Sequence, residues 1–257
     1  MNATRWTGIM IVLLIAAAAV FAPVLATHSP IRSSIDFLQG PSTVHWFGTD
    51  DLGRDVFSRV LFGARTSLIV GIGAAFFATA LGVPIGMIAG YSGGKIDMLI
   101  VQLIDLFIAL PGLVLALIIT AMVGATLENL MFTLGFVMWP TIARLVRGQV
   151  LNIRNSVYVE AGIAVGGKAS WIIRAHITPN ILRVVSAQFA ITVSFAIFTS
   201  ASLSFLGLGI PPPTPDWGGM VRAGFDFLSI NPLLSLGPGS AISLIVFGFY
   251  LIGSTIE

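Results

Sequence analysis

The chain has 257 residues, of which 56% are hydrophobic and only 9% are charged, and its mean hydropathy is +0.97. No water-soluble domain of this length has such a balance, so the composition excludes a soluble protein and predicts an all-α protein of the lipid bilayer. The positive charges are not gathered into one basic face, which argues against a nucleic-acid partner, and there is no cysteine for disulfides or thiolate metal sites.

Six apolar stretches are long enough to cross a bilayer as helices. The first also has features of a cleaved signal peptide, because Arg5 precedes its apolar core and Val24–Ala26 resembles a cleavage site. We interpret it as an uncleaved anchor. The six predicted spans are residues 8–26, 67–90, 98–123, 129–147, 184–207 and 233–254.

We interpret residues 1–257 as one membrane domain. Residues 1–66 hold the anchor and an extracytoplasmic segment, and residues 67–257 form a five-helix core. From Asp51 onward the segment predicts a helix on the outer membrane surface, with Asp55 and Arg59 paired one turn apart. The chain stops directly after the last predicted span, without the short basic tail that we expect there, which suggests truncation.

The distribution of Lys and Arg indicates which way the spans run. If the N-terminus is cytoplasmic, eight of the 13 basic residues fall on the cytoplasmic side and five on the far side. We therefore predict cytoplasmic N- and C-termini in a bacterial or archaeal cytoplasmic membrane. The longest cytoplasmic segment is then residues 148–183. The eight are Arg5, Lys95, Arg144, Arg147, Arg154, Lys168, Arg174 and Arg183.

The cytoplasmic segment contains the polar stretch "YVEAGIAVGGKASWIIRAHITPN". Its small residues predict a short helix and turn on which a partner's groove can close, and Glu160 can reach a basic partner. A helix that rests on lipid headgroups through Tyr158 and Trp171 is an equally good interpretation from the chemistry alone. The stretch also approximates a phosphate-binding loop, but Ala169 stands where a Ser or Thr would hold Mg²⁺, so we expect no nucleotide there.

The same stretch resembles the EAA motif of ABC-importer permeases. It has Glu160, Ala161 and Gly162, then Gly166, then "HITPN", although Gly162, His176 and Thr178 replace the usual alanine, isoleucine and leucine. In that family the motif forms the coupling helix that sits in a cleft of the ATP-binding subunit. The resemblance therefore implies a surface for docking the ATPase subunit, made by Tyr158, Glu160, Ala161, Gly162, Gly166 and Gly167.

Three longer stretches resemble the permeases of the dipeptide, oligopeptide and nickel importer group, most of all their dipeptide C-type subunits. They cover most of the chain after residue 45, in the order that the family has them. They are "FGTDDLGRDVFSRVLFGARTSL" from Phe47, "WPTIARLVRGQVLNIRNSVYVEA" from Trp139 and "FLGLGIPPPTPDWGGM" from Phe205.

This resemblance implies the type I ABC importer permease fold, with six spans and a cytoplasmic coupling helix. It implies a non-catalytic subunit that works with a second, homologous permease, two ATP-binding subunits and an extracytoplasmic solute-binding protein. The chain itself would bind no cofactor, because ATP and Mg²⁺ belong to the partner subunits. The expected substrate is a di- or oligopeptide, and a nickel complex or another small solute is the alternative. A proton-coupled secondary transporter and a membrane scaffold remain as rival classes.

Polar residues in the fifth predicted span suit the lining of a watery pathway, because they share one narrow face of a helix. Hydrogen bonding between helices explains them equally well. These residues, with one aromatic among them, are Gln188, Thr192, Phe195, Thr199 and Ser202.

Asp105 is the one acid well inside a predicted span, which makes it a candidate proton site. Arg147 lies as far beyond the turn near Thr126 as Asp105 lies before it, so a structural ion pair between the two is the preferred interpretation. The second span has small residues at every fourth position, which predict a stripe for close helix packing. They are Ala74, Ala78, Gly82, Gly86 and Gly90.

The histidines, His28, His45 and His176, fall in predicted loops without a nucleophile or a metal-ligand pattern beside them, so we predict no metal site. The six spans contain no histidine and only Asp105 as an acid. A pathway for a metal would gain from imidazole or clustered carboxylates, so the sequence favours a peptide substrate over nickel.

Overall fold

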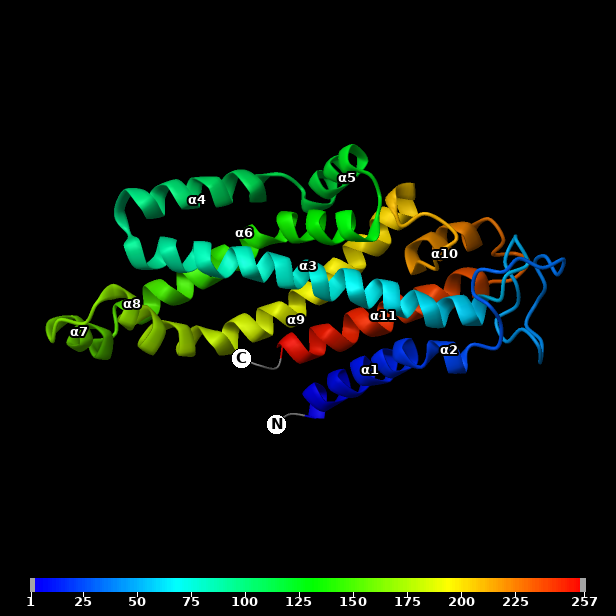
Figure 1. Cartoon of the computed structure of the whole chain (residues 1–257), viewed down its shortest axis with the longest axis horizontal. Helices are drawn as coiled ribbons and strands as arrows, with labels where there is room; N and C mark the ends of the chain where they lie inside the picture. The colour runs from blue at the N-terminus through cyan, green and yellow to red at the C-terminus, as the bar shows by residue number, and fades with distance from the viewer. Residues whose placement is uncertain (1–2, 255–257) are drawn as a thin grey trace.

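The computed structural model describes residues 3–254, and within that range it is helical, with no strand. The molecule is an elongated bundle of long helices (Figure 1). In chain order the helices are α1 (Ala3–Val20), α2 (Ala22–Leu25), α3 (Val56–Ser92), α4 (Gly94–Ala109), α5 (Gly112–Val123), α6 (Leu127–Arg154), α7 (Val157–Ala164), α8 (Ala169–Ile172), α9 (Thr178–Leu203), α10 (Trp217–Phe225) and α11 (Leu233–Ser254), and the π-helical turns η1 (Ile173–Ile177) and η2 (Ser204–Leu208) flank α9.

Among the described residues, five helical stretches are long and apolar enough to cross a membrane: α1, α3, α6, the stretch Ala169–Leu208 and α11. The predicted span 98–123 is not a straight helix, because α4 and α5 meet at a bend of 85°. Leu110, before Pro111, has an extended ψ of 133°, and proline disfavours a helical residue ahead of it. With the bent pair counted as one crossing, the predicted total of six is reached, and the protein is a multi-pass membrane protein.

Helix α3 begins eleven residues before the predicted second span. The Asp55 carboxylate caps it by accepting a hydrogen bond of 2.8 Å from the Ser58 N–H. The outer surface helix and the second span are therefore one continuous helix, and the proposed division at residue 66 falls inside it. The predicted Asp55–Arg59 pair is wrong: Asp55 is occupied at the helix cap, and Arg59 pairs with Asp50 at 3.6 Å.

The predicted packing stripe is confirmed along the contact of α3 with α6. Ala74 and Ala78 are fully buried, and a methyl group added at any of the three glycines would press on α6. At Gly86 the added carbon would lie 2.4 Å from the Ala143 carbonyl oxygen and 2.9 Å from the Val146 Cβ. Small residues let the two backbones approach closely where lipid offers no hydrophobic drive for packing.

Changing Gly86→Ala should therefore destabilise the folded chain, because the new methyl group forces α3 and α6 apart; overpacking of this kind costs about 1–3 kcal/mol. Thermal unfolding in lipid nanodiscs measures the loss. Gly148→Ala is the matched control, since nothing lies within 4 Å of the added carbon there and alanine favours the helix. Equal unfolding temperatures for the two variants would contradict the close packing.

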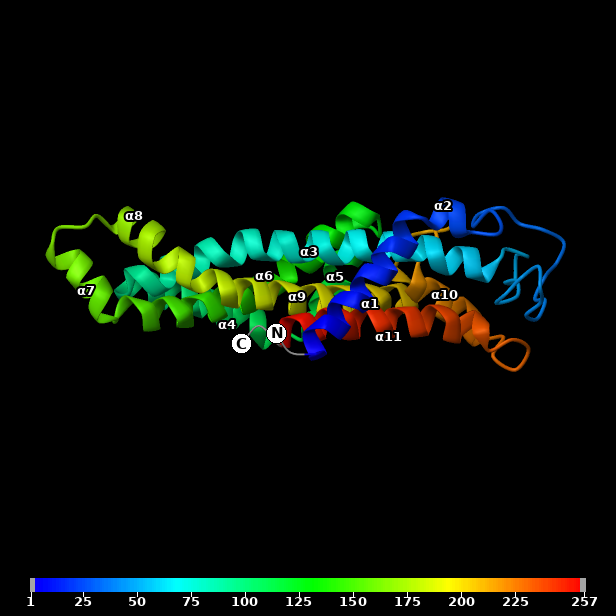
Figure 2. The ribbon, with the colours of Figure 1, turned by 90° about the horizontal axis from the view of Figure 1, so that it is seen from below.

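The two ends of the bundle differ. Helices α7 and α8 form one end, and the loops between α2 and α3 lie at the opposite end beside α10, as both views show (Figures 1 and 2). Helices α1 and α11 run antiparallel, side by side, and Gly8 of α1 packs against Gly248 and Leu251 of α11. The Arg65 guanidinium joins α1 to α3 by donating to the carbonyls of Ala19 and Val20 at 2.5 and 2.8 Å.

Candidate functional site

Residues 156–178 form a compact knob at one end of the bundle. Ser156 is the extended residue before α7, and the helix ends at Ala164, with Val165 as its C-cap. Gly166 then has φ of +85°, a conformation that suits glycine, and the Gly167 N–H donates to the Gly162 carbonyl at 3.0 Å. This turn reverses the chain and returns it through α8 to the long helix α9.

One face of α7 packs inward and anchors the knob. Val159 is fully buried and joins the same core cluster as Ile172 and Ile177 of the returning chain. Gly162 is buried too, and a carbon added to it would lie 3.0 Å from the Ile172 Cδ1 and 3.4 Å from the Trp171 ring. The prediction that Gly162 belongs to an outward docking face is therefore wrong. Its missing side chain makes room for α8 instead.

The opposite face of α7 is open. Tyr158 and Ile163 are about half exposed, and Val165 is 82% exposed. These apolar side chains surround Glu160, Ala161, Ala164 and Gly166, which are exposed as well, while Gly167 is half-buried. We call this set the docking face; it consists of Tyr158, Glu160, Ala161, Ile163, Ala164, Val165 and Gly166.

His176, which stands where the motif usually has isoleucine, fills an aromatic contact inside the knob. Its ring centroid lies 4.8 Å from that of Trp171, edge to face, and 5.8 Å from that of Tyr158. The departure from the motif is thus accommodated by Trp171, and the ring helps to hold α7 against the returning chain.

The polar residues predicted to line a pathway do not all share one open face. Thr192 is buried, and its hydroxyl donates to the Gln188 carbonyl at 2.8 Å. Thr199 and Ser202 are half-buried, whereas Phe195 is 61% exposed. The open face of α9 is therefore mainly aromatic, with Phe198 beside Phe195, and hydroxyls at its margin.

The predicted Asp105–Arg147 ion pair is wrong in its partners. Arg147 binds Asp97 through two parallel hydrogen bonds of 2.5 and 2.7 Å, and Asp105 pairs with Arg144. Both pairs join α4 to α6. Counting residues from the turn near Thr126 placed Asp105 opposite Arg147, whereas its partner, Arg144, lies about one helical turn earlier. The break at Leu110 shifts α4 relative to α6, which the count did not include.

A cavity of about 530 Å³ at the opposite end of the bundle was not anticipated from the sequence. The stretch "FGTDDLGRD", the turn after α9 and α10 enclose it. Burial raises the pKa of the Asp216 carboxyl, which also accepts a hydrogen bond of 3.0 Å from the Gly219 N–H. Charged side chains of both signs line the cavity: Asp50, Asp51, Arg54, Arg59, Asp216 and Arg222.

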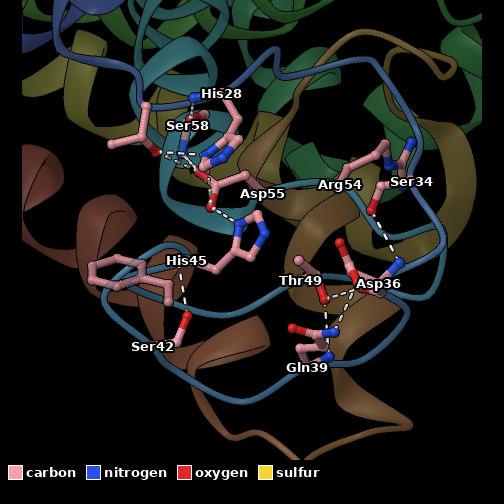
Figure 3. Close-up of polar contacts among 12 residues, drawn as sticks. His28, Ser34, Asp36, Gln39, Ser42, His45, Thr49, Arg54, Asp55 and Ser58 are labelled. Carbon is pink, nitrogen blue, oxygen red and sulfur yellow. Dashed lines mark hydrogen bonds and ion pairs between the residues drawn. The ribbon is translucent and has the colours of Figure 1, made fainter.

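Two of the histidines that seemed isolated in the sequence come together at Asp55, beyond the lining of this cavity (Figure 3). The His45 Nδ1 lies 2.9 Å from the Asp55 Oδ1. This cluster could not be found from the sequence, because the three residues are separated along the chain and lie in segments without periodic structure.

Known proteins share both the sequence and the fold of this chain. Residues 82–256 match the family described as "binding-protein-dependent transport system inner membrane component". The dipeptide transport system permease protein DppC of Alkalihalophilus pseudofirmus is 41% identical over 98% of this chain and 83% of its own length. The oligopeptide permease OppC of Bacillus subtilis is 36% identical, also over 98% of this chain and 83% of its own length.

A solved structure supports the fold independently. The inward-facing methionine ABC transporter MetNI contains a chain that superposes with a TM-score of 0.59 at 18% identity, covering 77% of this chain and 96% of that one. The all-helical bundle is therefore the permease fold expected from the sequence. The chain belongs to the family of binding-protein-dependent transport system inner membrane components, the permease subunits of ABC importers.

Proposed function

We propose that this chain forms half of the translocation pathway of an ATP-driven importer of short peptides. The names of its relatives, which transport dipeptides and oligopeptides, support the substrate class. The complete importer would add a second permease, two ATP-binding subunits that hold ATP and Mg²⁺, and a solute-binding protein on the far side. The chain itself would be non-catalytic, with both termini in the cytoplasm.

The observation that carries this proposal is the docking face on α7. It is a small, apolar and exposed surface with one acid, Glu160, at the tip of the bundle, and a groove in a partner protein can receive such a helix. Its inner face is fixed to the membrane helices, because Val159 shares a core cluster with Val146 of α6 and Ile181 of α9. A rigid knob of this kind passes movement of an attached ATPase subunit directly to two spans.

We assign the open face of α9 to the contact with the second permease and to the pathway between the two. Phe195 and Phe198 would pack against the partner, and the hydroxyls of Thr199 and Ser202 would meet the substrate's peptide groups. Gln188 would contribute from the cytoplasmic part of the helix, whereas Thr192 is buried and would not reach the pathway. Weak, replaceable contacts of this kind allow a solute to leave as well as to enter.

The charged cavity favours a peptide over a nickel complex. A short peptide carries an ammonium group at one end and a carboxylate at the other, and the cavity presents carboxylates beside guanidinium groups. Guanidinium groups bind carboxylates through paired hydrogen bonds. The cavity would thus receive the two ends of the peptide as it leaves the solute-binding protein.

Uptake into proteoliposomes tests the substrate class. The complete importer should transport labelled di- to pentapeptides when ATP is supplied on the side of the membrane that faces the ATP-binding subunits. Labelled nickel is offered to the same preparation in parallel. Nickel flux that peptides fail to compete would overturn the peptide assignment.

A further inference from the structure

Three potential metal ligands meet where the extracytoplasmic segment reaches α3 (Figure 3). The Nδ1 atoms of His45 and His28 lie 2.9 and 3.8 Å from the same Asp55 oxygen, Oδ1. One ligand atom from each residue lies within 4.8 Å of the other two, and the centroids of the imidazole rings are 4.5 Å apart. Two imidazoles and a carboxylate thus converge on one point.

We propose that His28, His45 and Asp55 form a binding site for a divalent transition metal, with Zn²⁺ as the best match. Metal–ligand bonds of about 2.0–2.1 Å in a tetrahedron place the ligand atoms about 3.3 Å apart. The two measured distances to the Asp55 Oδ1 lie on either side of that value. Imidazole nitrogens with a carboxylate oxygen suit Zn²⁺, Cu²⁺ and Ni²⁺ better than Mg²⁺ or Ca²⁺.

The surrounding hydrogen bonds orient the ligands. The other Asp55 oxygen, Oδ2, accepts from the Ser58 N–H at 2.8 Å and from the Thr27 hydroxyl at 3.4 Å, which leaves Oδ1 for a cation. The backbone N–H of His28 donates to the Ser58 hydroxyl at 3.1 Å and fixes that residue against α3. Such outer contacts are a regular part of protein metal sites.

Metal binding replaces two contacts of the metal-free protein: that of the His28 Nδ1 with the Thr27 hydroxyl at 3.0 Å, and that of the His45 Nδ1 with Asp55. The distance of 2.9 Å between His45 and Asp55 is that of a hydrogen bond, in which Nδ1 carries the proton and donates it to the carboxylate. A cation bound at Nδ1 requires that each ring carry its proton on Nε2 instead. The cation then compensates the negative charge of Asp55, whose side chain is fully buried.

The burial pattern leaves one side of the site open. His45 and Asp55 are buried, whereas the His28 side chain is 39% exposed, so a metal ion and a fourth ligand from water can reach the site past His28. None of the three residues lines the charged cavity, which separates this site from the proposed substrate. The metal would tie two loops of the extracytoplasmic segment to the first turn of α3.

Zinc binding to the full-length chain tests the site. The protein is purified in detergent without a histidine tag, stripped with a chelator and titrated with Zn²⁺, and bound metal is counted after dialysis. We expect one equivalent at saturation and a higher unfolding temperature in its presence. His28→Ala should weaken binding by at least about 100-fold, since losing even an outer-shell partner costs roughly 10- to 100-fold.

The variants separate a built site from incidental binding. His28→Ala keeps the His45–Asp55 contact and the α3 cap, so it should stay folded. His176→Ala removes the histidine at the other end of the bundle and should leave zinc affinity unchanged. Co²⁺ bound to the unmodified chain should show the visible absorption of a four-coordinate ion. Absence of a stoichiometric site, unaltered affinity in His28→Ala or an equal loss in His176→Ala would each overturn the proposal.

Discussion

Replacing Ala161 with tryptophan should abolish ATP-driven uptake while leaving the chain folded. Ala161 is exposed on the docking face, so an indole placed there can extend into solvent, and it fills the space that a partner groove must occupy. The ATP-binding subunits should no longer co-purify, and uptake should fall at least about tenfold, as expected when a central interface position loses more than about 1.4 kcal/mol.

Ser170→Trp is the matched control, because Ser170 is exposed on α8 of the same knob but outside the docking face. It should keep both the subunits and the uptake. A tryptophan at Gly162 cannot serve the same purpose, since that position is packed against Ile172 and the substitution would disrupt the knob itself. Normal assembly and transport by the Ala161→Trp variant would show that the ATPase docks elsewhere.

Removing Asp97 should destabilise the chain. Its carboxylate holds Arg147 through two hydrogen bonds, and the two side chains are only 17% and 29% exposed. Asp97→Ala leaves a half-buried guanidinium between α4 and α6 without its carboxylate, which should cost about 1–3 kcal/mol, more than the loss of an exposed pair and less than that of a fully buried one. Thermal unfolding of the variant in nanodiscs measures this loss.

The neighbouring pair supplies the comparison. Asp105 and Arg144 are 58% and 50% exposed, so Asp105→Ala should cost no more than about 1 kcal/mol. The double change Asp97→Arg with Arg147→Asp should recover part of the stability lost in the single variant. Equal unfolding temperatures for Asp97→Ala and Asp105→Ala would contradict the expectation that the more buried pair contributes more to stability.

Features that depend on composition and local spacing, namely the spans and one contact between helices, could be predicted from the sequence. Apolar stretches of about 20 residues located the spans, and small residues four apart located the contact of α3 with α6, because both signals repeat with the helix. The knob was found from its small residues, but the sequence could not show which of them turn inward. Gly162 and Gly166 are both glycines, but Gly162 is packed against Ile172 of α8 and Gly166 is open. The difference depends on the position of α8, which local spacing does not reveal.

Contacts between distant segments could not be predicted in this way. The partner of Arg147 depends on how the bend at Leu110 displaces α4, and a single helix break shifts the whole register. His28, His45 and Asp55 meet through irregular loops whose path is set by side-chain hydrogen bonds, such as that from the Gln39 N–H to the Thr49 hydroxyl at 2.9 Å. Periodicity carries no information about such segments.

The length of α3 makes it a lever. Its 37 residues correspond to about 55 Å, roughly twice the hydrocarbon thickness of a bilayer, and α6 packs on both sides of Pro84 where the helix would otherwise be weakest. A tilt of about 5° at the Asp55 end displaces the Ser92 end by about 5 Å, by the geometry of a rod of that length. Small events at one surface of the membrane can therefore be amplified mechanically at the other, without any change inside α3 itself.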